Sequence, residues 1–260
     1  MFNRVSNKVN FFLSRASTIF LSFGLISCSS LTKDREGAEL HLKVGTSQLQ
    51  SGLYPQALSS LLQAEKLDDT HPQVQNNLGL AYFVRERYDL AEQHIRKAIT
   101  LDPNYSDARN NLARVLIERG QYSEALKEVR PVLNDLTYSS PEKPFFNAGL
   151  AYFYLKDFSN ASLYFRKSLQ IQKENCLAQN FLGRTYYEQK QWNQAAENLD
   201  RAASYCQKDQ FDEPQYFSGL SYMEQGLKEK AEARWDELLK VYPSGKYRAQ
   251  AQTLLKEIRR

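Results

Sequence analysis

Small residues recur along the chain at a nearly constant spacing. The separations between successive small residues are 34, 34, 36, 34 and 36 residues. These marker positions are Gly45, Gly79, Ala113, Gly149, Gly183 and Gly219. An alanine stands twelve residues after every marker, and an aromatic residue stands three residues after four of the six. A period of this length exceeds a single helix or strand, so it indicates an internal structural repeat.

The most regular copy occupies residues 72–105. Its apolar residues follow helical spacing in two segments, and Pro103 comes after the second segment because proline cannot continue a helix. The small positions allow the two helices to approach closely, and the aromatic positions fill the space between one copy and the next. This pattern resembles the tetratricopeptide repeat. The resemblance implies an all-α fold, a right-handed superhelical solenoid of six tetratricopeptide repeats with a C-terminal capping helix.

The repeat copies can be delimited from the marker positions. We expect them at residues 38–71, 72–105, 106–139, 142–175, 176–209 and 212–245. Residues 246–260 are expected to form the capping helix that covers the last apolar face. The whole region 38–245 is then one repeat domain.

The N-terminal residues have the features of an export signal. Three basic residues and no acidic residue occur in residues 1–27, and a short apolar run of 12 residues ends at Ser27. Twelve helical residues are too short to cross a hydrocarbon core of about 30 Å, so residues 1–27 are interpreted as a lipoprotein signal peptide. The sequence Leu25-Ile26-Ser27-Cys28 resembles a lipobox, which implies lipidation of Cys28 and a lipidated tether over 28–37. An ordinary cleaved signal, with Cys28 as a bystander, is the alternative.

The lipobox resemblance carries an expectation about location. Ser29 follows the cysteine, and by similarity to sorting in Gram-negative bacteria the lack of aspartate there favours the outer membrane. We therefore expect a lipid-anchored protein that faces the periplasm.

Charge and residue chemistry narrow the function classes. The chain has 34 basic and 30 acidic residues; removing the three basic residues of the signal leaves 34 − 3 = 31 against 30. With basic and acidic residues so nearly balanced, the sequence gives no indication of the basic surface that nucleic-acid binding requires. His41, His71 and His94 have no partner at metal-ligand spacing, and no phosphate-binding or nucleophile motif occurs. We predict a protein that is not an enzyme and that needs neither metal nor cofactor.

Two further cysteines are placed for a disulfide. Cys176 is expected to open the first helix of the fifth copy and Cys206 to close the second. Antiparallel helices bring those two ends together, and the periplasm is oxidising. A bridge would add on the order of 3 kcal/mol by the loop-entropy model. The alternative is that the two residues are small apolar side chains that never pair.

The first helix of each copy should present a groove to a protein partner. Positions 5, 6, 9, 12 and 13 of each copy are expected to face solvent there. An amide recurs at position 6 of three successive copies, and such amides can bind the backbone of an extended peptide. Apolar residues beside them could anchor side chains, although each aromatic could equally pack against the next copy. The predicted groove residues are Asn77, Leu80, Phe83, Asn111, Arg114, Phe146, Asn147, Leu150, Phe153, Tyr154 and Tyr187.

A more specific resemblance covers residues 106–170. There the sequence Asn134 to Leu150, NDLTYSSPEKPFFNAGL, contains a two-residue insertion, and it is similar to the PilF/PilW/Tgl type of type IV pilus lipoprotein. The resemblance implies a pilotin that binds secretin subunits and promotes their assembly in the outer membrane. Adaptors for cell-wall hydrolases of the NlpI type, or for outer-membrane barrel assembly, are the alternatives. The sequence leaves the oligomeric state and the partner's binding segment open.

Overall fold

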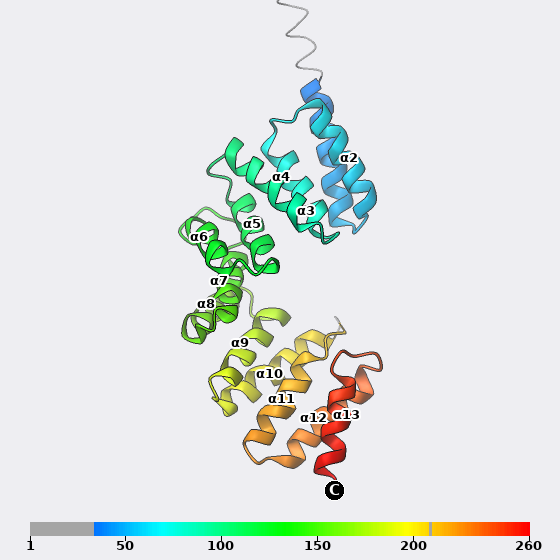
Figure 1. Ribbon diagram of the computed structural model, residues 1–260, viewed down its shortest axis with the longest axis vertical. Helices are drawn as coiled ribbons and strands as arrows, with labels where there is room; N and C mark the ends of the chain where they lie inside the picture. The colour runs from blue at the N-terminus through cyan, green and yellow to red at the C-terminus, as the bar shows by residue number, and fades with distance from the viewer. Residues whose placement is uncertain (1–33, 208–209) are drawn as a thin grey trace, which may run out of the picture. The chain divides into compact units, whose positions relative to one another are not determined.

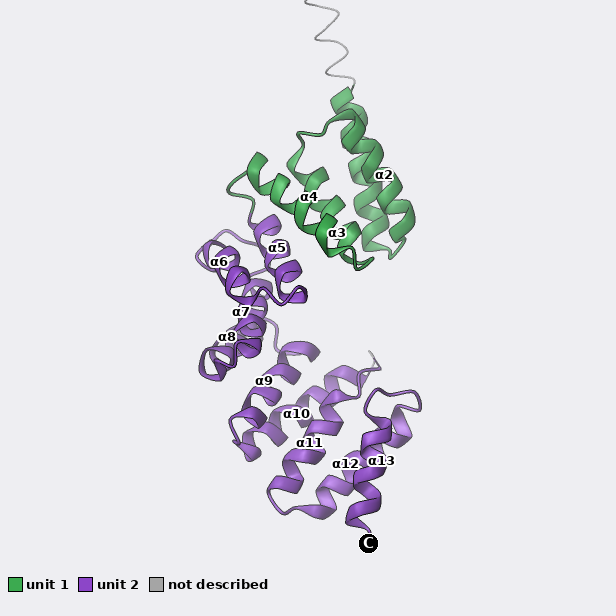
Figure 2. Ribbon diagram, viewed as in Figure 1, with its two compact units in different colours: residues 1–105 green, residues 106–260 purple. Residues whose placement is uncertain are grey.

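The computed structural model describes residues 34–207 and 210–260. Within these ranges every regular element is helical, and the chain divides into two compact units, residues 1–105 and 106–260 (Figures 1 and 2). The predicted signal peptide and Cys28 lie outside the described residues. The all-α prediction is confirmed.

Unit 1 contains two helix pairs in its described part. The first pair is the helix through residues 34–50 and α2 (Tyr54–Leu67); the second is α3 (Pro72–Phe83) and α4 (Tyr88–Leu101). The first helix already exists at residue 34, four residues before the expected start of the first copy. Part of the predicted tether is therefore helical, and it continues directly into buried Ala38 and Leu42.

Unit 2 continues the same arrangement and ends in a single helix (Figure 2). Each predicted copy in it corresponds to one helix pair, and α13 lies within the expected cap. The helices are α5 (Ser106–Glu118), α6 (Tyr122–Leu133), α7 (Glu142–Tyr154), α8 (Phe158–Ile171), α9 (Cys176–Glu188), α10 (Trp192–Cys206), α11 (Glu213–Glu224), α12 (Lys228–Val241) and α13 (Arg248–Ile258).

The marker residue of each pair faces a large side chain sixteen residues later. A methyl group placed on Gly149 would lie 2.6 Å from the Phe165 ring, and one on Gly183 would lie 2.6 Å from Leu199 Cγ. The same contact joins Gly45 to Leu61, Gly79 to Ile95 and Gly219 to Trp235. These partners are fully buried. Each marker is therefore small because the second helix places its largest core side chain against it.

The turn between the two helices of each copy also repeats. Seven residues after each marker the backbone adopts a positive φ, between 58° and 75°. Glycine fills this place in three copies, and it tolerates that conformation without a steric cost. The other three copies have charged residues instead, and a side chain there costs roughly 1–2 kcal/mol. The turn residues are Gly52, Glu86, Gly120, Lys156, Lys190 and Gly226.

The last pair is closed by the capping helix. Trp235, Leu238 and Tyr242 of the sixth copy are buried with Ala251 and Leu255 of α13. These residues form one apolar cluster, so α13 removes from water a face that would otherwise end the stack exposed.

A histidine in unit 1 is held in a polar pocket between helices. His94 Nδ1 lies 2.8 Å from Gln75 Oε1 and 3.7 Å from Glu65 Oε1, and the His94 ring stacks on Tyr82 at 5.3 Å between centroids. Burial lowers the pKa of His94 below its usual 6.5, an effect that Glu65 partly opposes.

We predict that Gly183→Ala destabilises the protein by about 1–3 kcal/mol, because the added methyl group overpacks the contact with Leu199. The gain in helix propensity offsets only part of this cost. The double variant Gly183→Ala, Leu199→Val imitates the third copy, which has Ala113 and Val129 at these places. Urea unfolding should show that the double variant loses less than the sum of the single losses. Strict additivity would contradict the contact.

We also predict that acid weakens unit 1 through His94. Because the folded pKa is below the unfolded value, the unfolded chain binds more protons, and stability falls as the pH drops below about 6.5. Unfolding midpoints at neutral and mildly acidic pH should differ less in a His94→Gln variant than in the native chain. Identical pH dependence in the two proteins would rule out the role of His94.

Candidate functional site

The first helices of unit 2 bring a set of aromatic rings together. Helix α9 packs against both α7 and α11. Phe153 and Phe181 lie 5.5 Å apart between ring centroids, Tyr187 and Phe217 also 5.5 Å, and Phe217 and Tyr247 5.8 Å, each pair in an edge-to-face arrangement. We call this surface the aromatic face. It comprises Phe146, Phe153, Tyr154, Phe181, Tyr187, Tyr216, Phe217 and Tyr247.

A charged pair lies among these rings. Arg184 Nη1 is 2.5 Å from Glu213 Oε1, and the guanidinium lies 3.9 Å from the centre of the Phe217 ring and 5.6 Å from that of Phe153. The Arg184 and Glu213 side chains are only 18% and 10% exposed. A cation over an aromatic face is stabilised by the ring's charge distribution, and more strongly where water is excluded.

Further donors complete the environment of the Glu213 carboxylate. Asn180 Nδ2 donates to Oε1 at 3.0 Å, and the Tyr247 hydroxyl donates to Oε2 at 3.1 Å. The buried Asn180 Oδ1 and Arg184 Nε have no hydrogen-bond partner among the described residues. We call Arg184, Glu213, Asn180 and Tyr247 the centre of the aromatic face. The charges of Arg184 and Glu213 cancel, and both carboxylate oxygens accept hydrogen bonds. Asn180 Oδ1 and Arg184 Nε are still able to form a hydrogen bond.

The phenols of the aromatic face remain protonated near neutral pH. Burial raises the pKa of Tyr154 and Tyr187, and burial together with the nearby Glu213 carboxylate raises the pKa of Tyr247 to about 12. At neutral pH these side chains are uncharged rings, and each has a hydroxyl able to donate or accept a hydrogen bond.

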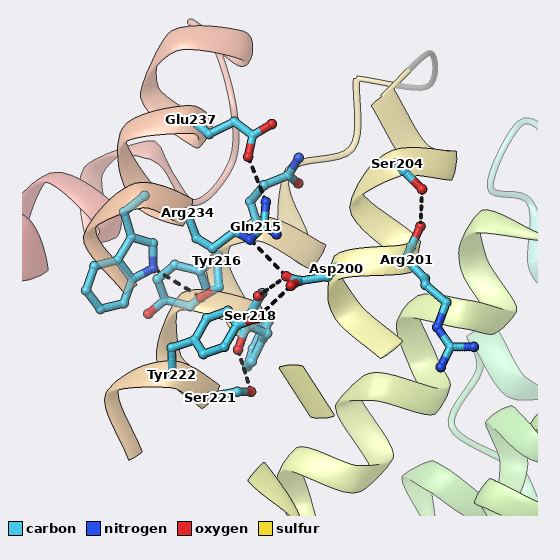
Figure 3. A network of polar contacts seen from close by, with 12 residues as sticks. Asp200, Arg201, Ser204, Gln215, Tyr216, Ser218, Ser221, Tyr222, Arg234 and Glu237 are labelled. Atoms are coloured by element: carbon cyan, nitrogen blue, oxygen red, sulfur yellow. Dashed lines mark hydrogen bonds and ion pairs between the residues drawn. The ribbon is translucent and has the colours of Figure 1, made fainter. Parts of the chain in front are cut away.

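Helix α11 is also held by a second polar network (Figure 3). Asp200 of α10 accepts hydrogen bonds from the Ser218 hydroxyl at 2.5 Å and the Tyr222 hydroxyl at 2.7 Å, and Arg234 Nε lies 2.8 Å from its Oδ1. Arg234 in turn lies 2.9 Å from Glu237. Helices α10, α11 and α12 are joined at one carboxylate, which sets the position of α11 and hence of the rings it carries.

In unit 2, Asn147 of the predicted amide row does not face solvent. Asn147 is 5% exposed, and its Nδ2 donates to Asn110 Oδ1 at 2.9 Å. The expectation that it faces solvent is therefore wrong. The reason is that α7 packs against α5, which brings position 6 of the fourth copy onto position 5 of the third. Asn111 of the third copy is half-buried.

The amide of unit 1 is likewise engaged within its own unit. Asn77 Nδ2 donates to Thr46 Oγ1 at 2.8 Å, and Asn77 Oδ1 accepts from Asn76. The contact with Thr46 joins the two helix pairs of unit 1, so a structural role accounts for this side chain.

The predicted apolar residues divide by exposure. Phe83 and Phe153 are each 8% exposed, so the expectation that they face solvent is wrong. Phe83 packs near Tyr88 at 5.7 Å between centroids, and Phe153 packs on Phe158 of its own copy and on Phe181 of the next. The more accessible predicted residues are the half-buried Leu80, Phe146, Leu150 and Tyr187, the exposed Arg114, and Tyr154 at 45% exposure.

Two residues of the centre were missed by the sequence reasoning. Glu213 occupies position 2 of its copy. Tyr247 lies beyond the last repeat, at the N-cap of α13. The sequence gives no repeating signal at either place. Only the convergence of α9, α11 and the start of α13 brings them together.

The two cysteines of the fifth copy are joined in the structure. Cys176 and Cys206 form a disulfide with their Cα atoms 5.0 Å apart, linking the start of α9 to the end of α10. The bridge closes the open end of this helix pair. Its contribution is structural.

Other kinds of site were sought in the described part of the chain. No group of three or more His, Cys, Asp or Glu side chains that could hold a metal ion occurs in residues 34–207 and 210–260. Among those same residues, no helix combines the length and the apolar character needed to cross a bilayer.

Comparison with known proteins gives the repeat its family. Models of the tetratricopeptide repeat match residues 42–106, 85–137, 143–175 and 218–245. The chain is therefore a tetratricopeptide-repeat protein. No curated protein sequence matches it.

Solved structures share its fold over most of its length. PilF of Pseudomonas aeruginosa is 21% identical, with a TM-score of 0.72 over 85% of this chain and 99% of its own. PilW, a type IV pilus biogenesis factor, is 20% identical, with a TM-score of 0.76 over 84% of this chain and 98% of its own. A chain of the APC/C hetero-tetramer Cut9–Hcn1 is 17% identical, with a TM-score of 0.72 over 90% of this chain and 45% of its own. The fold is of the PilF and PilW type.

We predict that Arg184→Leu destabilises the protein by about 3 kcal/mol or more, because it leaves the Glu213 carboxylate buried without its cation. The double variant Arg184→Leu, Glu213→Gln should recover part of this loss. Arg201→Leu is the matched control, since its ion pair with Glu197 is exposed and should contribute no more than about 1 kcal/mol. Denaturant unfolding measures all three. If Arg184→Leu costs no more than Arg201→Leu, the buried centre does not stabilise the fold.

Proposed function

We propose that this protein is a scaffold of type IV pilus biogenesis that binds a protein partner through the aromatic face of unit 2. Likeness to PilF and PilW supports this proposal, because it extends over nearly the full length of both proteins. The observation that supports placing the binding site on this face is the cluster of aromatic rings around Arg184 and Glu213.

The chemistry of the face suits a polypeptide ligand. Tyr154 is 45% exposed; Leu150, one turn before it on α7, and Tyr187 of α9 are half-buried. Aromatic side chains lose little conformational entropy on binding, and together with arginine they are enriched among the residues that dominate protein interfaces. The phenol hydroxyls can bond to a peptide backbone. A partner that inserts apolar side chains among these rings would meet an already ordered surface.

The finer proposal concerns the partner and the location. We propose that the partner is an outer-membrane secretin subunit and that a lipid on Cys28 holds the protein at the outer membrane. In that arrangement the lipid determines where the protein resides and the repeats hold the subunit until it assembles. The lipobox resemblance and the PilF/PilW/Tgl resemblance support both parts.

A site-specific crosslinking experiment tests the proposed face. A photoreactive amino acid replaces Tyr154 in the full chain expressed in its own bacterium, and trapped proteins are identified by mass spectrometry. Leu163 is the matched control position, because it is a similarly exposed apolar residue (39%) on α8. We expect secretin subunits to be trapped from Tyr154 and not from Leu163.

The other outcomes are informative. A cell-wall hydrolase or a barrel-assembly protein trapped specifically from Tyr154 would replace the secretin proposal, and equal trapping from both positions would exclude the face as the binding site.

The same strain with Cys28→Ala tests the anchor: the protein should leave the outer-membrane fraction. An unchanged distribution would refute lipidation as the anchor.

A further inference from the structure

Positions 3 and 7 of a first helix are where the preceding copy packs. In the second copy these are Val74 and Leu78, which are buried in one cluster with Leu61 and Ala64 of α2. The second helix of the preceding copy also packs against α7, α9 and α11. The residues at positions 3 and 7 of those helices are all buried: Pro144, Ala148, Ala178, Leu182, Pro214 and Ser218.

The first copy lacks this cover within the described part of the chain. Leu40 and Val44 occupy positions 3 and 7 of the helix through residues 34–50, and they are 62% and 41% exposed. They lie one turn apart on the same side of the helix, so they form an apolar stripe. We call this stripe, with the exposed Glu36 and Lys43 beside it, the N-terminal face. The later copies indicate that such a stripe packs against another helix.

The charges beside the stripe are self-complementary. Glu36 precedes Leu40 by four residues, and Lys43 follows it by three. At 3.6 residues per turn the two side chains lie about 40° and 60° from Leu40, on the same flank of the stripe. They lie about 6 Å before it and 4.5 Å after it along the helix axis.

This arrangement selects one way of pairing two such helices. If a two-fold axis runs past Leu40 and the helices are antiparallel, Glu36 of each copy faces Lys43 of the other, and the two leucines meet between the two ion pairs. If the helices are parallel, Glu36 faces Glu36 and Lys43 faces Lys43, which is repulsive. The charges therefore favour the antiparallel pair.

The opposite end of the chain does not offer a matching surface. Helix α13 buries Ala251 and Leu255 against the sixth copy, and its exposed side chains are polar apart from Ala249. The N-terminal face of one copy would therefore find no apolar surface on the α13 end of another. Stacking of copies head to tail into a filament is disfavoured, whereas a two-fold pair closes on itself.

We propose that two copies of this chain form a symmetric dimer through the N-terminal face. The two helices through residues 34–50 lie antiparallel, Leu40 packs against Leu40 at the two-fold axis, and Glu36 of each copy pairs with Lys43 of the other. No residue of the aromatic face takes part, and the dimer does not rest on the proposed pilus function.

Disulfide trapping in the protein's own bacterium tests the pairing. Two full-length copies with different tags are co-expressed, one with Glu36→Cys and the other with Lys43→Cys, and the cells are treated with a mild oxidant. We expect a disulfide-linked pair that carries both tags. Ser123→Cys with Arg130→Cys is the matched control, because these exposed positions have the same seven-residue spacing on α6. The control should give only the background of random collisions.

The orientation is tested by expressing each cysteine variant alone. In the antiparallel pair two Glu36→Cys positions are about 12 Å apart along the helix axis, too far for a disulfide, so either variant alone should give no more than background. Strong linkage within one variant would show a parallel pair and overturn the proposal. The proposal is also overturned if the mixed pair is no more abundant than the control, or if the cysteines link to a different protein instead.

A charge exchange tests the ion pairs. Glu36→Lys alone or Lys43→Glu alone turns both pairs into like-charge contacts, so each should weaken dimerisation about tenfold at low salt. The double variant Glu36→Lys, Lys43→Glu restores both pairs in reverse and should return the dissociation constant to within about threefold of the native value. Sedimentation equilibrium of the full-length protein in detergent measures all four proteins.

Recovery in the double variant also excludes a folding defect as the cause of the single losses. A native protein that stays monomeric at every concentration would overturn the proposal, and so would a double variant as weak as the single ones. None of these results bears on crosslinking from Tyr154 or on the partner trapped there, so this proposal and the proposed function fail independently.

Discussion

The contact between a small residue on the first helix of a copy and a large side chain on its second helix governs the rest of the structure. Gly149 against Phe165 and Gly183 against Leu199 show the arrangement at its closest, with no room for a methyl group. The close approach places the two helices of a pair at a fixed separation, and the positive-φ turn seven residues after the marker connects them. Repeated along the chain, this geometry places successive first helices of a unit side by side.

The aromatic face follows from that placement. Within unit 2, the side-by-side packing of α7, α9 and α11 lets rings from different copies meet edge to face. Arg184 and Glu213 then form a centre in which charge, ring and hydroxyl groups stabilise one another, and the Asp200 network ties α11 to α10 and α12. A surface built in this way is ordered in the free protein, so binding at the proposed site would cost little conformational entropy.

The sequence predicts the repeats well and the site only in part. Helix pairs can be predicted from the marker spacing, because every copy packs a small residue of its first helix against a large side chain of its second. The turns with positive φ could not be predicted at Glu86, Lys156 and Lys190, since these residue types do not favour that conformation. Asn147 and Phe153 were expected to face solvent, but neighbouring helices cover them.

The remaining differences have the same cause. Whether a position on a first helix is exposed depends on the helix packed beside it, which a single repeat does not reveal. Tyr247 lies outside every repeat, and Glu213 lies at a position with no periodic signal. Tyr247 reaches the centre because the capping helix begins there, whereas Glu213 reaches it because α11 packs against α9.

Native-state amide hydrogen exchange on the full chain tests the central packing claim most directly. If the contact between Gly183 and Leu199 unites a helix pair, neither helix can keep its core buried without the other. The amides of α9 and α10 should then exchange through one shared opening reaction, with equal opening free energies and equal denaturant dependence. Rapid exchange throughout α9 while α10 stays protected would contradict the account.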